Sequence, residues 1–151
     1  MNNRWRMGLV GLGIVGVTAA VALAESKSDA KAHEEGLIKE ANTTMQEACG
    51  CPSIKFDVDW DSYSRGEDMV HISNPARNIA DRKVHVCSDD KKAAWCKWSK
   101  NVVYKIHMSK TKKYTFTASK DGKTFDCGMP PWEDGMACEG DVVIDAFKNA
   151  N

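Results

Sequence analysis

The chain has 151 residues, which is enough for one ordinary domain and too few for two domains of average size. Its content of 42% hydrophobic and 28% charged residues is that of a globular protein and excludes wholesale disorder. Its 21 basic and 21 acidic residues give a formal net charge of zero, which by itself argues against a nucleic-acid-binding protein.

Residues 1–24 have the composition of a secretory signal peptide. Arg4 and Arg6 precede the uncharged stretch 7–24, which ends in Ala-Leu-Ala. A basic start, an apolar middle and small residues at the end predict export, with cleavage before Glu25. The mature protein is then secreted or periplasmic and has no membrane span. The alternative is an uncleaved membrane anchor, although four glycines lower the helix propensity of this stretch.

The mature chain is predicted to begin with a flexible segment followed by one helix. Residues 25–32 are charged and rich in Ala and Ser, so we expect a flexible N-terminus before a single domain over 33–151. Apolar residues then recur at helical spacing, and Gly50 and Pro52 form a stop signal. The spacing predicts a helix over 33–48.

The next part of the chain contains one clear strand pattern. Residues 53–61 alternate strictly between apolar and charged side chains, which predicts a half-buried antiparallel strand. Shorter apolar runs predict strands at 69–72 and 84–87. Ser88 and the acids that follow it resemble a helix N-cap, and a short helix is expected over 91–98.

Residues 102–127 carry the strongest β signal. Two alternating segments are followed by Asp121-Gly122, a dipeptide suited to a hairpin turn, and by a third strand. This pattern predicts a three-stranded meander, and residues 141–148 predict a closing helix. The expected fold class is therefore α+β: an N-terminal helix packed on an antiparallel sheet of four to six strands, stabilised by disulfides.

All six cysteines lie in the mature chain, and an even number in an oxidising compartment predicts disulfide bonds. The six are Cys49, Cys51, Cys87, Cys96, Cys127 and Cys138. If 87–96 and 127–138 each close locally, Cys49 and Cys51 are left to form a tight, reducible bridge suited to thiol–disulfide exchange. The other interpretation is that Cys49 and Cys51 pair with two different strands and clamp the helix to the sheet.

The net charge of zero is a cancellation between segments. Residues 25–68 sum to −6, residues 69–90 to zero, residues 91–123 to +9 and residues 124–151 to −5. The basic segment also contains aromatic residues, and lysines beside exposed rings bind phosphate, sulfate or carboxylate polymers. The zero therefore does not exclude an anionic partner.

The candidate anion- or partner-binding residues lie in this basic segment. They are Lys91, Lys92, Trp95, Lys97, Trp98, Lys105, Lys110, Lys112 and Lys113. Trp95 and Trp98 are the aromatic residues that we expect to be exposed. The alternative is internal neutralisation, in which the acidic row Asp57, Asp59 and Asp61 lies beside the lysines on one sheet.

The sequence predicts neither a calcium site nor a histidine metal site. The spacing Asp57-x-Asp59-x-Asp61 matches the start of a calcium loop, but the pattern is that of a strand. His71, His85 and His107 each fall in a segment predicted as a strand, without metal-ligand spacing. The sequence also contains no catalytic motif and no cofactor fingerprint, so we expect no catalytic residues and no cofactor.

The sequence thus predicts a small exported, non-catalytic binding protein. Its partner would be an anionic envelope polymer or a protein, contacted through residues 91–123, and no sequence-specific nucleic acid. One alternative is a redox protein that uses Cys49-Gly50-Cys51. Another is a stoichiometric inhibitor that presents the loop 128–137, where Trp132 lies between two prolines and two acids.

Overall fold

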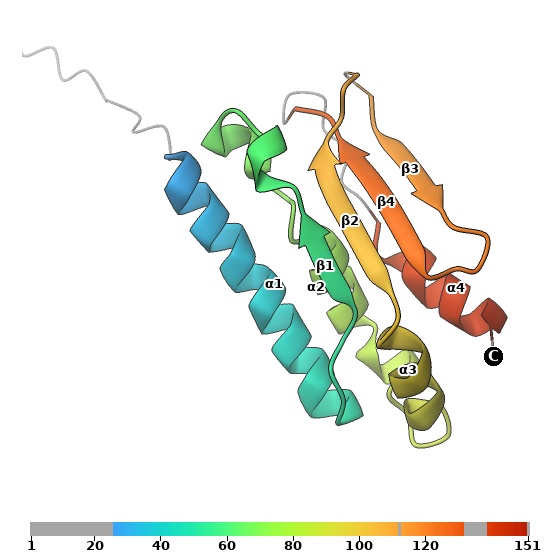
Figure 1. Ribbon diagram of the computed structural model, residues 1–151. Helices are drawn as coiled ribbons and strands as arrows, with labels where there is room; N and C mark the ends of the chain where they lie inside the picture. The colour runs from blue at the N-terminus through green and yellow to red at the C-terminus, as the bar shows by residue number, and fades with distance from the viewer. Residues whose placement is uncertain (1–25, 112, 132–138, 151) are drawn as a thin grey trace, which may run out of the picture.

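The computed structural model describes residues 26–111, 113–131 and 139–150 (Figure 1). The helices are α1 (Lys27–Cys49), α2 (Asn74–Asp81), α3 (Lys92–Ser99) and α4 (Asp141–Ala150). The strands are β1 (Lys55–Val58), β2 (Val103–Met108), β3 (Thr115–Ala118) and β4 (Thr124–Met129). Short 3₁₀ helices form η1 (Trp60–Ser62), η2 (Gly66–Met69) and η3 (Lys83–His85). The α+β class is confirmed.

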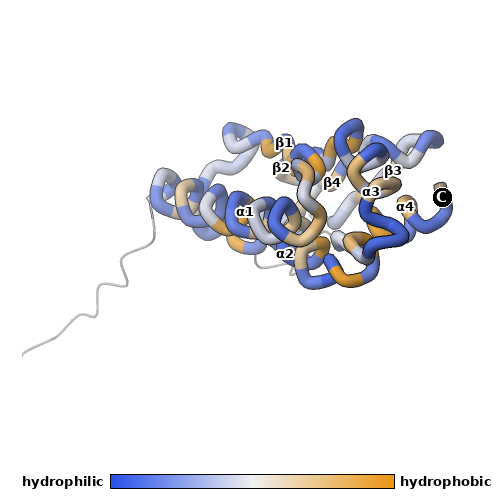
Figure 2. The backbone as a smooth tube through the Cα atoms, turned by 90° about the horizontal axis from the view of Figure 1, so that it is seen from below, coloured by the Kyte–Doolittle hydropathy of each residue, from blue (hydrophilic) through white to orange (hydrophobic). Residues whose placement is uncertain are grey.

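The strands form one mixed four-stranded sheet in the order β1-β2-β4-β3. Viewed along the sheet, the strands make one layer and α2 and α4 lie in a second layer on one of its faces, with α1 beside α2 (Figure 2). Helix α3 lies at the end of the sheet where β2 begins (Figure 1). The opposite face of the sheet carries the polar side chains of the strands and is open to solvent, as the alternating burial of β2 indicates.

The prediction of an antiparallel meander is wrong. β2 is parallel to both β1 and β4, and only β3 and β4 are antiparallel. The connection from β1 to β2 contains α2 and α3, which gives it the length that a parallel crossover needs. β4 lies inside the sheet because Phe125, Cys127 and Met129 are buried, whereas three of the four β3 residues are exposed. Alternation shows which residues share a face, but it does not show which strands are neighbours.

Helix α1 begins six residues before its predicted start and ends where the sequence indicated. The Ser26 side chain accepts a hydrogen bond from the Asp29 backbone N–H, which is the arrangement of an N-cap. At the other end Gly50 has φ 71°, and its N–H donates to the Gln46 carbonyl. The main contacts of α1 are with α2 and η2, and its packing on the sheet itself stays a prediction.

Two predicted strands are helical turns. Met69 is the last residue of η2, residues 70–72 form the turn that follows it, and His71 has a left-handed φ of 79°. Residues 84–87 overlap η3. Short apolar runs of this kind do not distinguish a strand from a buried turn, because either one can bury alternate side chains. The positions of α3 and α4 and the hairpin at Asp121-Gly122 are confirmed.

Two disulfides hold the C-terminus of α1 to the segment that follows α2. Cys49 pairs with Cys87, and Cys51 pairs with Cys96. The predicted local pairing of Cys87 with Cys96 is therefore wrong, and so is a bridge between Cys49 and Cys51. The two partners lie after η3 and in α3, so the clamp joins helical segments and not strands.

The structure describes only one cysteine of the predicted pair Cys127–Cys138. Cys127 is disulfide-bonded, and Cys138 lies outside the described residues. Within the described ranges, no helix has both the length and the apolar character needed to cross a membrane.

Candidate functional site

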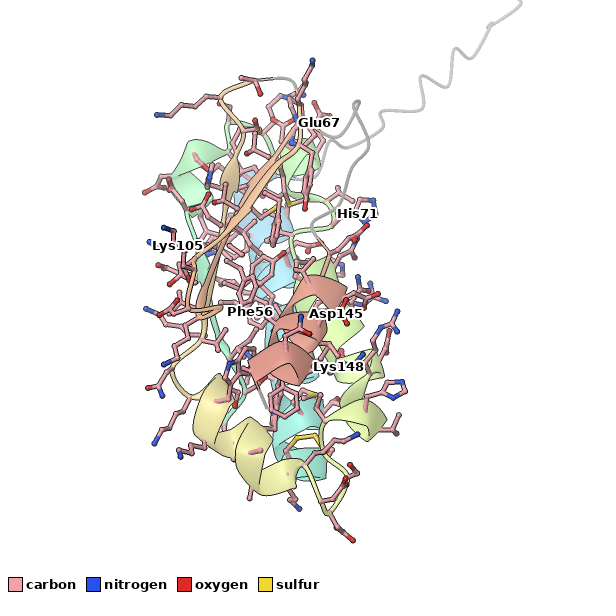
Figure 3. All side chains as sticks on the ribbon, turned by 90° about the vertical axis from the view of Figure 1, so that its right-hand side faces the viewer. Phe56, Glu67, His71, Lys105, Asp145 and Lys148 are labelled. Atoms are coloured by element: carbon pink, nitrogen blue, oxygen red, sulfur yellow. A yellow bond between two sulfur atoms is a disulfide. The ribbon has the colours of Figure 1, made fainter. Side chains whose placement is uncertain are left out.

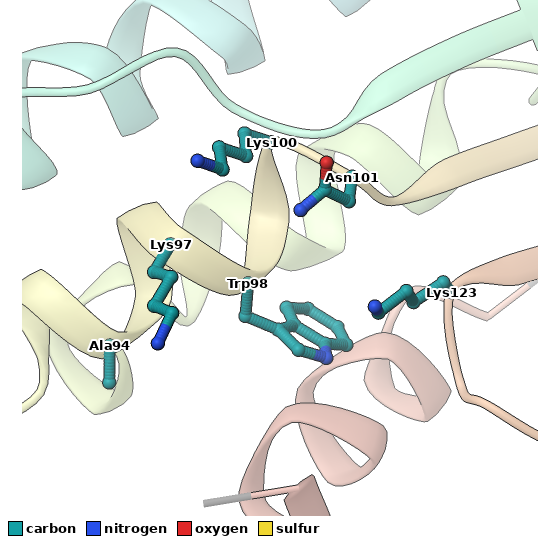
Figure 4. Close-up of a pocket in the computed structure, with 6 residues that line it drawn as sticks. All are labelled: Ala94, Lys97, Trp98, Lys100, Asn101 and Lys123. Atoms are coloured by element: carbon teal, nitrogen blue, oxygen red, sulfur yellow. The ribbon is translucent and has the colours of Figure 1, made fainter.

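A cavity of about 320 Å³ opens between the end of α3 and the β3–β4 hairpin (Figure 4). Its lining residues are Ala94, Lys97, Trp98, Lys100, Asn101 and Lys123. Among the residues that the structure describes, this lining contains three lysines and no carboxylate. A small surface with three positive charges favours an anion in the cavity.

The wall of the cavity is positioned by aromatic packing. The Trp98 ring centroid lies 5.5 Å from that of Trp95 and 5.5 Å from that of Phe147 in α4. Trp95 and Phe147 meet edge to face at 5.2 Å. Because these rings are packed on both helices, the end of α3 has little freedom to move relative to α4.

Backbone hydrogen bonds then place the polar residues. After α3 the chain turns so that the Asn101 N–H donates to the Trp98 carbonyl. The Val103 N–H donates to the Lys123 carbonyl at 2.9 Å, which holds the hairpin against the start of β2. Lys97 and Lys123 consequently lie on opposite sides of the Trp98 ring (Figure 4). Residues 97 and 123 are distant in sequence, and the pairing of β2 with β4 brings them together.

One acid lies near this cavity without lining it. The Ser119 hydroxyl and the Lys123 backbone N–H hydrogen-bond the Asp121 carboxylate, and these contacts hold the pKa of Asp121 below its ordinary value. The Asp121 carboxylate thus accepts hydrogen bonds within the hairpin turn and stabilises that turn.

The predicted residues in and next to α3 either line the cavity, lie in the core or lie away from the cavity. Lys97 and Trp98 line the cavity, although Trp98 is only 8% exposed and Trp95 is 0% exposed. The expectation that these two indoles are exposed is wrong, because residues three apart share one helix face and that face packs on α4. The end of the Lys92 side chain lies beside Gly50 at the C-terminus of α1, where a positive charge is favourable. Lys91 is exposed at the start of α3.

The sequence singles out neither Ala94 nor three polar lining residues. Lys100 and Lys123 were counted in the +9 segment, but nothing in their spacing indicated that they converge with Lys97. Asn101 follows α3 directly and carries no recognisable motif. Only the register of β2 with β4 could have indicated the cluster.

Lys105 lies in a different place, on the open face of the sheet, where its side chain points away from α4 (Figure 3). The strand register sets Lys105 between Asp57 on β1 and Asp126 on β4. The acidic strand therefore does lie beside a lysine of the basic segment, as the neutralisation alternative expected. This charge balance leaves Lys105 a weak candidate for an anion, and the lysines around Trp98 a better one.

His107 also belongs to this open face. Its Nδ1 lies 2.9 Å from the Met108 carbonyl oxygen, and its Nε2 lies 3.1 Å from Asp126 Oδ1. Both neighbours are acceptors, so both ring nitrogens are suited to donate. The Met108 carbonyl, with the carboxylates of Asp126 and Asp59, raises the pKa of His107 against the opposing effect of partial burial. With both nitrogens engaged, this imidazole is not placed to act as a general base.

The remaining predicted residues lie at the other end of the sheet or outside the description. Lys110 and Lys113 are exposed in the β2–β3 loop, at the end opposite α3 (Figure 1). Lys112 and Trp132 lie outside the described residues. Most of the loop 128–137 does so too, and the inhibitor alternative stays a prediction.

Neither metal arrangement is assembled in the described part of the chain. Over 26–111, 113–131 and 139–150, no group of three or more His, Cys, Asp or Glu side chains is arranged to hold a metal ion. Asp59 instead accepts a hydrogen bond from the Ser62 backbone N–H and caps η1. Comparison with family models, with curated proteins and with solved structures finds no match to this chain. Its function is therefore argued from its own residues.

Proposed function

We propose that this protein is an exported, non-catalytic binding protein that recognises an anionic component of the cell envelope through the cavity beside Trp98. Export rests on the signal-like residues 1–24, and the two described disulfides are consistent with an oxidising compartment. The observation that carries the binding proposal is that Lys97, Lys100 and Lys123 all line one cavity, with no carboxylate among its described lining residues.

The electrostatic reason is the contrast between this cavity and the rest of the basic segment. Lys105 has carboxylates on both neighbouring strands, and Lys92 lies at a helix C-terminus. No acid shares the described lining with the cavity lysines, and the Asp121 carboxylate offsets part of the Lys123 charge from outside it. An incoming anion therefore meets less counter-charge here than at Lys105. Each charge-assisted contact then contributes about 1–2 kcal/mol to binding.

A salt-dependent binding experiment tests the proposal. Heparin and lipopolysaccharide are titrated into the protein by calorimetry between 50 and 300 mM salt. We expect K97Q/K100Q to weaken binding about 10-fold or more and to reduce the slope of log affinity against log salt. K123Q, on the other side of Trp98, should weaken it about 3- to 10-fold.

The matched control is K110Q/K113Q. This pair also removes two lysines three residues apart, but it lies at the opposite end of the sheet. We expect its binding to remain within about 2-fold of that of the unaltered protein. If the two pairs weaken binding equally, the contact extends over the whole basic segment and the cavity proposal is wrong. If neither polymer shows salt-dependent binding, the anionic partner itself is refuted.

A further inference from the structure

We infer that the cavity beside Trp98 binds a single phosphorylated sugar residue, whether free or as part of an envelope glycolipid. This inference rests on the proposed function and adds the class of ligand. Three properties of the cavity carry it: its volume, the kind of cation that it presents and the apolar surface between those cations.

The volume exceeds what an inorganic anion needs. About 320 Å³ corresponds to roughly ten water molecules at their share of liquid volume, and it lies at the lower limit of small-molecule pockets. A bare phosphate would leave most of this space filled with water. One six-membered ring with a phosphate group is the size of ligand that fits.

The cations select a compact, multiply charged group. Lysine presents a point charge, whereas the planar fork of arginine matches a carboxylate in two hydrogen bonds. The lining has three lysines and no arginine, so it gains most from the highest charge in the smallest volume. A phosphate monoester carries close to two negative charges above its second pKa of about 6. A sulfate ester or a carboxylate carries one.

The surface between the lysines suits a sugar ring. Trp98 and Ala94 provide an apolar wall, and the lysine side chains add their methylene stems. Asn101 offers an amide that both donates and accepts, which is what a sugar hydroxyl requires. Figure 4 shows Asn101 on one side of the indole and Lys97 and Lys123 at its flanks. A ring against this wall would place its phosphate beside Lys123, whose ammonium group points toward the indole, while Lys97 and Lys100 add positive charge farther along the lining (Figure 4).

Four small probes test the class of ligand by calorimetry on the mature protein. They are glucose 6-phosphate, glucose 6-sulfate, inorganic phosphate and glucose. At pH 7.5 we expect glucose 6-phosphate to bind at least about 5-fold more tightly than the sulfate ester or inorganic phosphate, and glucose not to bind. Equal affinity for glucose 6-phosphate and inorganic phosphate would overturn the inference, because the sugar ring would then contribute nothing.

The pH dependence adds a readout that general charge attraction does not give. Between pH 5 and pH 7.5 the phosphate ester gains its second charge, so its affinity should rise several-fold. The sulfate ester should bind equally at both values. The charged protein groups at the cavity are the three lysines of its lining and, beside it on the hairpin, Asp121, whose pKa lies below its ordinary value. A rise that is the same for both esters would contradict the inference.

Filling the cavity separates this inference from the proposed function. A94L adds a side chain at the half-buried lining position of α3 and removes no charge, and A93L makes the same change at the neighbouring exposed position. We expect A94L to weaken glucose 6-phosphate binding at least 10-fold while heparin binding changes less than 3-fold, and A93L to change neither. If heparin binds through the lysines but A94L does not affect the sugar phosphate, the ligand class is wrong and the anion site remains. Lipopolysaccharide vesicles that compete with glucose 6-phosphate would identify a lipid-borne sugar as the source.

Discussion

The two described disulfides should not contribute independently to stability. Their arrangement predicts how much less the 51–96 bridge contributes when the 49–87 bridge is present. Each bridge alone closes a loop with a sequence separation of 38 or 45 residues. By the chain-entropy relation such a loop is worth about 4 kcal/mol. Once the 49–87 bridge exists, however, the 51–96 bridge closes only a small ring of about 13 residues, formed by 49–51 and 87–96. That ring is worth about 3 kcal/mol.

The perturbation is therefore the pair C51A/C96A, made in two backgrounds. In the otherwise unaltered protein it should lower the free energy of unfolding by about 3 kcal/mol, and in C49A/C87A by about 4 kcal/mol. Cys51 and Cys96 are half-buried, and the packing cost of removing the buried Cys49 is common to both members of the second comparison. The change in unfolding free energy caused by C51A/C96A, taken separately in each background, thus reports the entropy of closing the 51–96 loop.

Urea unfolding without reductant, followed by tryptophan fluorescence, measures both differences. A loss that is equal in the two backgrounds, or larger in the unaltered protein, would refute the reasoning. So would a loss below about 1 kcal/mol in both, because the entropic account would then be the wrong one for these bridges.

Three further predictions concern the open face of the sheet and the end of α1. H107Q should destabilise the protein more at pH 5 than at pH 8.5 in thermal unfolding. The pKa of His107 is raised in the folded protein, so the stability from its contact with Asp126 is complete below the ordinary histidine pKa and is lost as the pH rises through the folded pKa. An equal effect at both pH values would contradict this. G128A should cost about 1–3 kcal/mol, since its Cβ would clash with Thr115 Oγ1, and the double variant with T115A should recover part of that loss in urea unfolding. G50A places a Cβ at φ 71° and should lower the unfolding free energy by about 1 kcal/mol, whereas G50N should lower it less.

The sequence determined the elements that local signals define. Helix α1 ends where Gly50 indicates it, α3 and α4 lie where their patterns place them, and the Asp121-Gly122 turn joins β3 to β4. These features depend on backbone conformation and side-chain spacing within a few residues, which a single chain segment carries in full. The start of α1 differs from the prediction because the turn after the Ser26 cap contains only charged and small residues and shows no apolar periodicity.

Which of those elements are neighbours depends on contacts between distant parts of the chain. Strand alternation is the same for parallel and antiparallel pairing, so nothing local placed β4 between β2 and β3 or brought Lys123 to Trp98. Six cysteines allow 15 connectivities, and their pairing follows from how α1 meets the segment after α2. The zero net charge illustrates the same division. Composition supplied the cancellation, and the register of β1 with β2 set Asp57 beside Lys105 while leaving the cavity lysines without an acid among them.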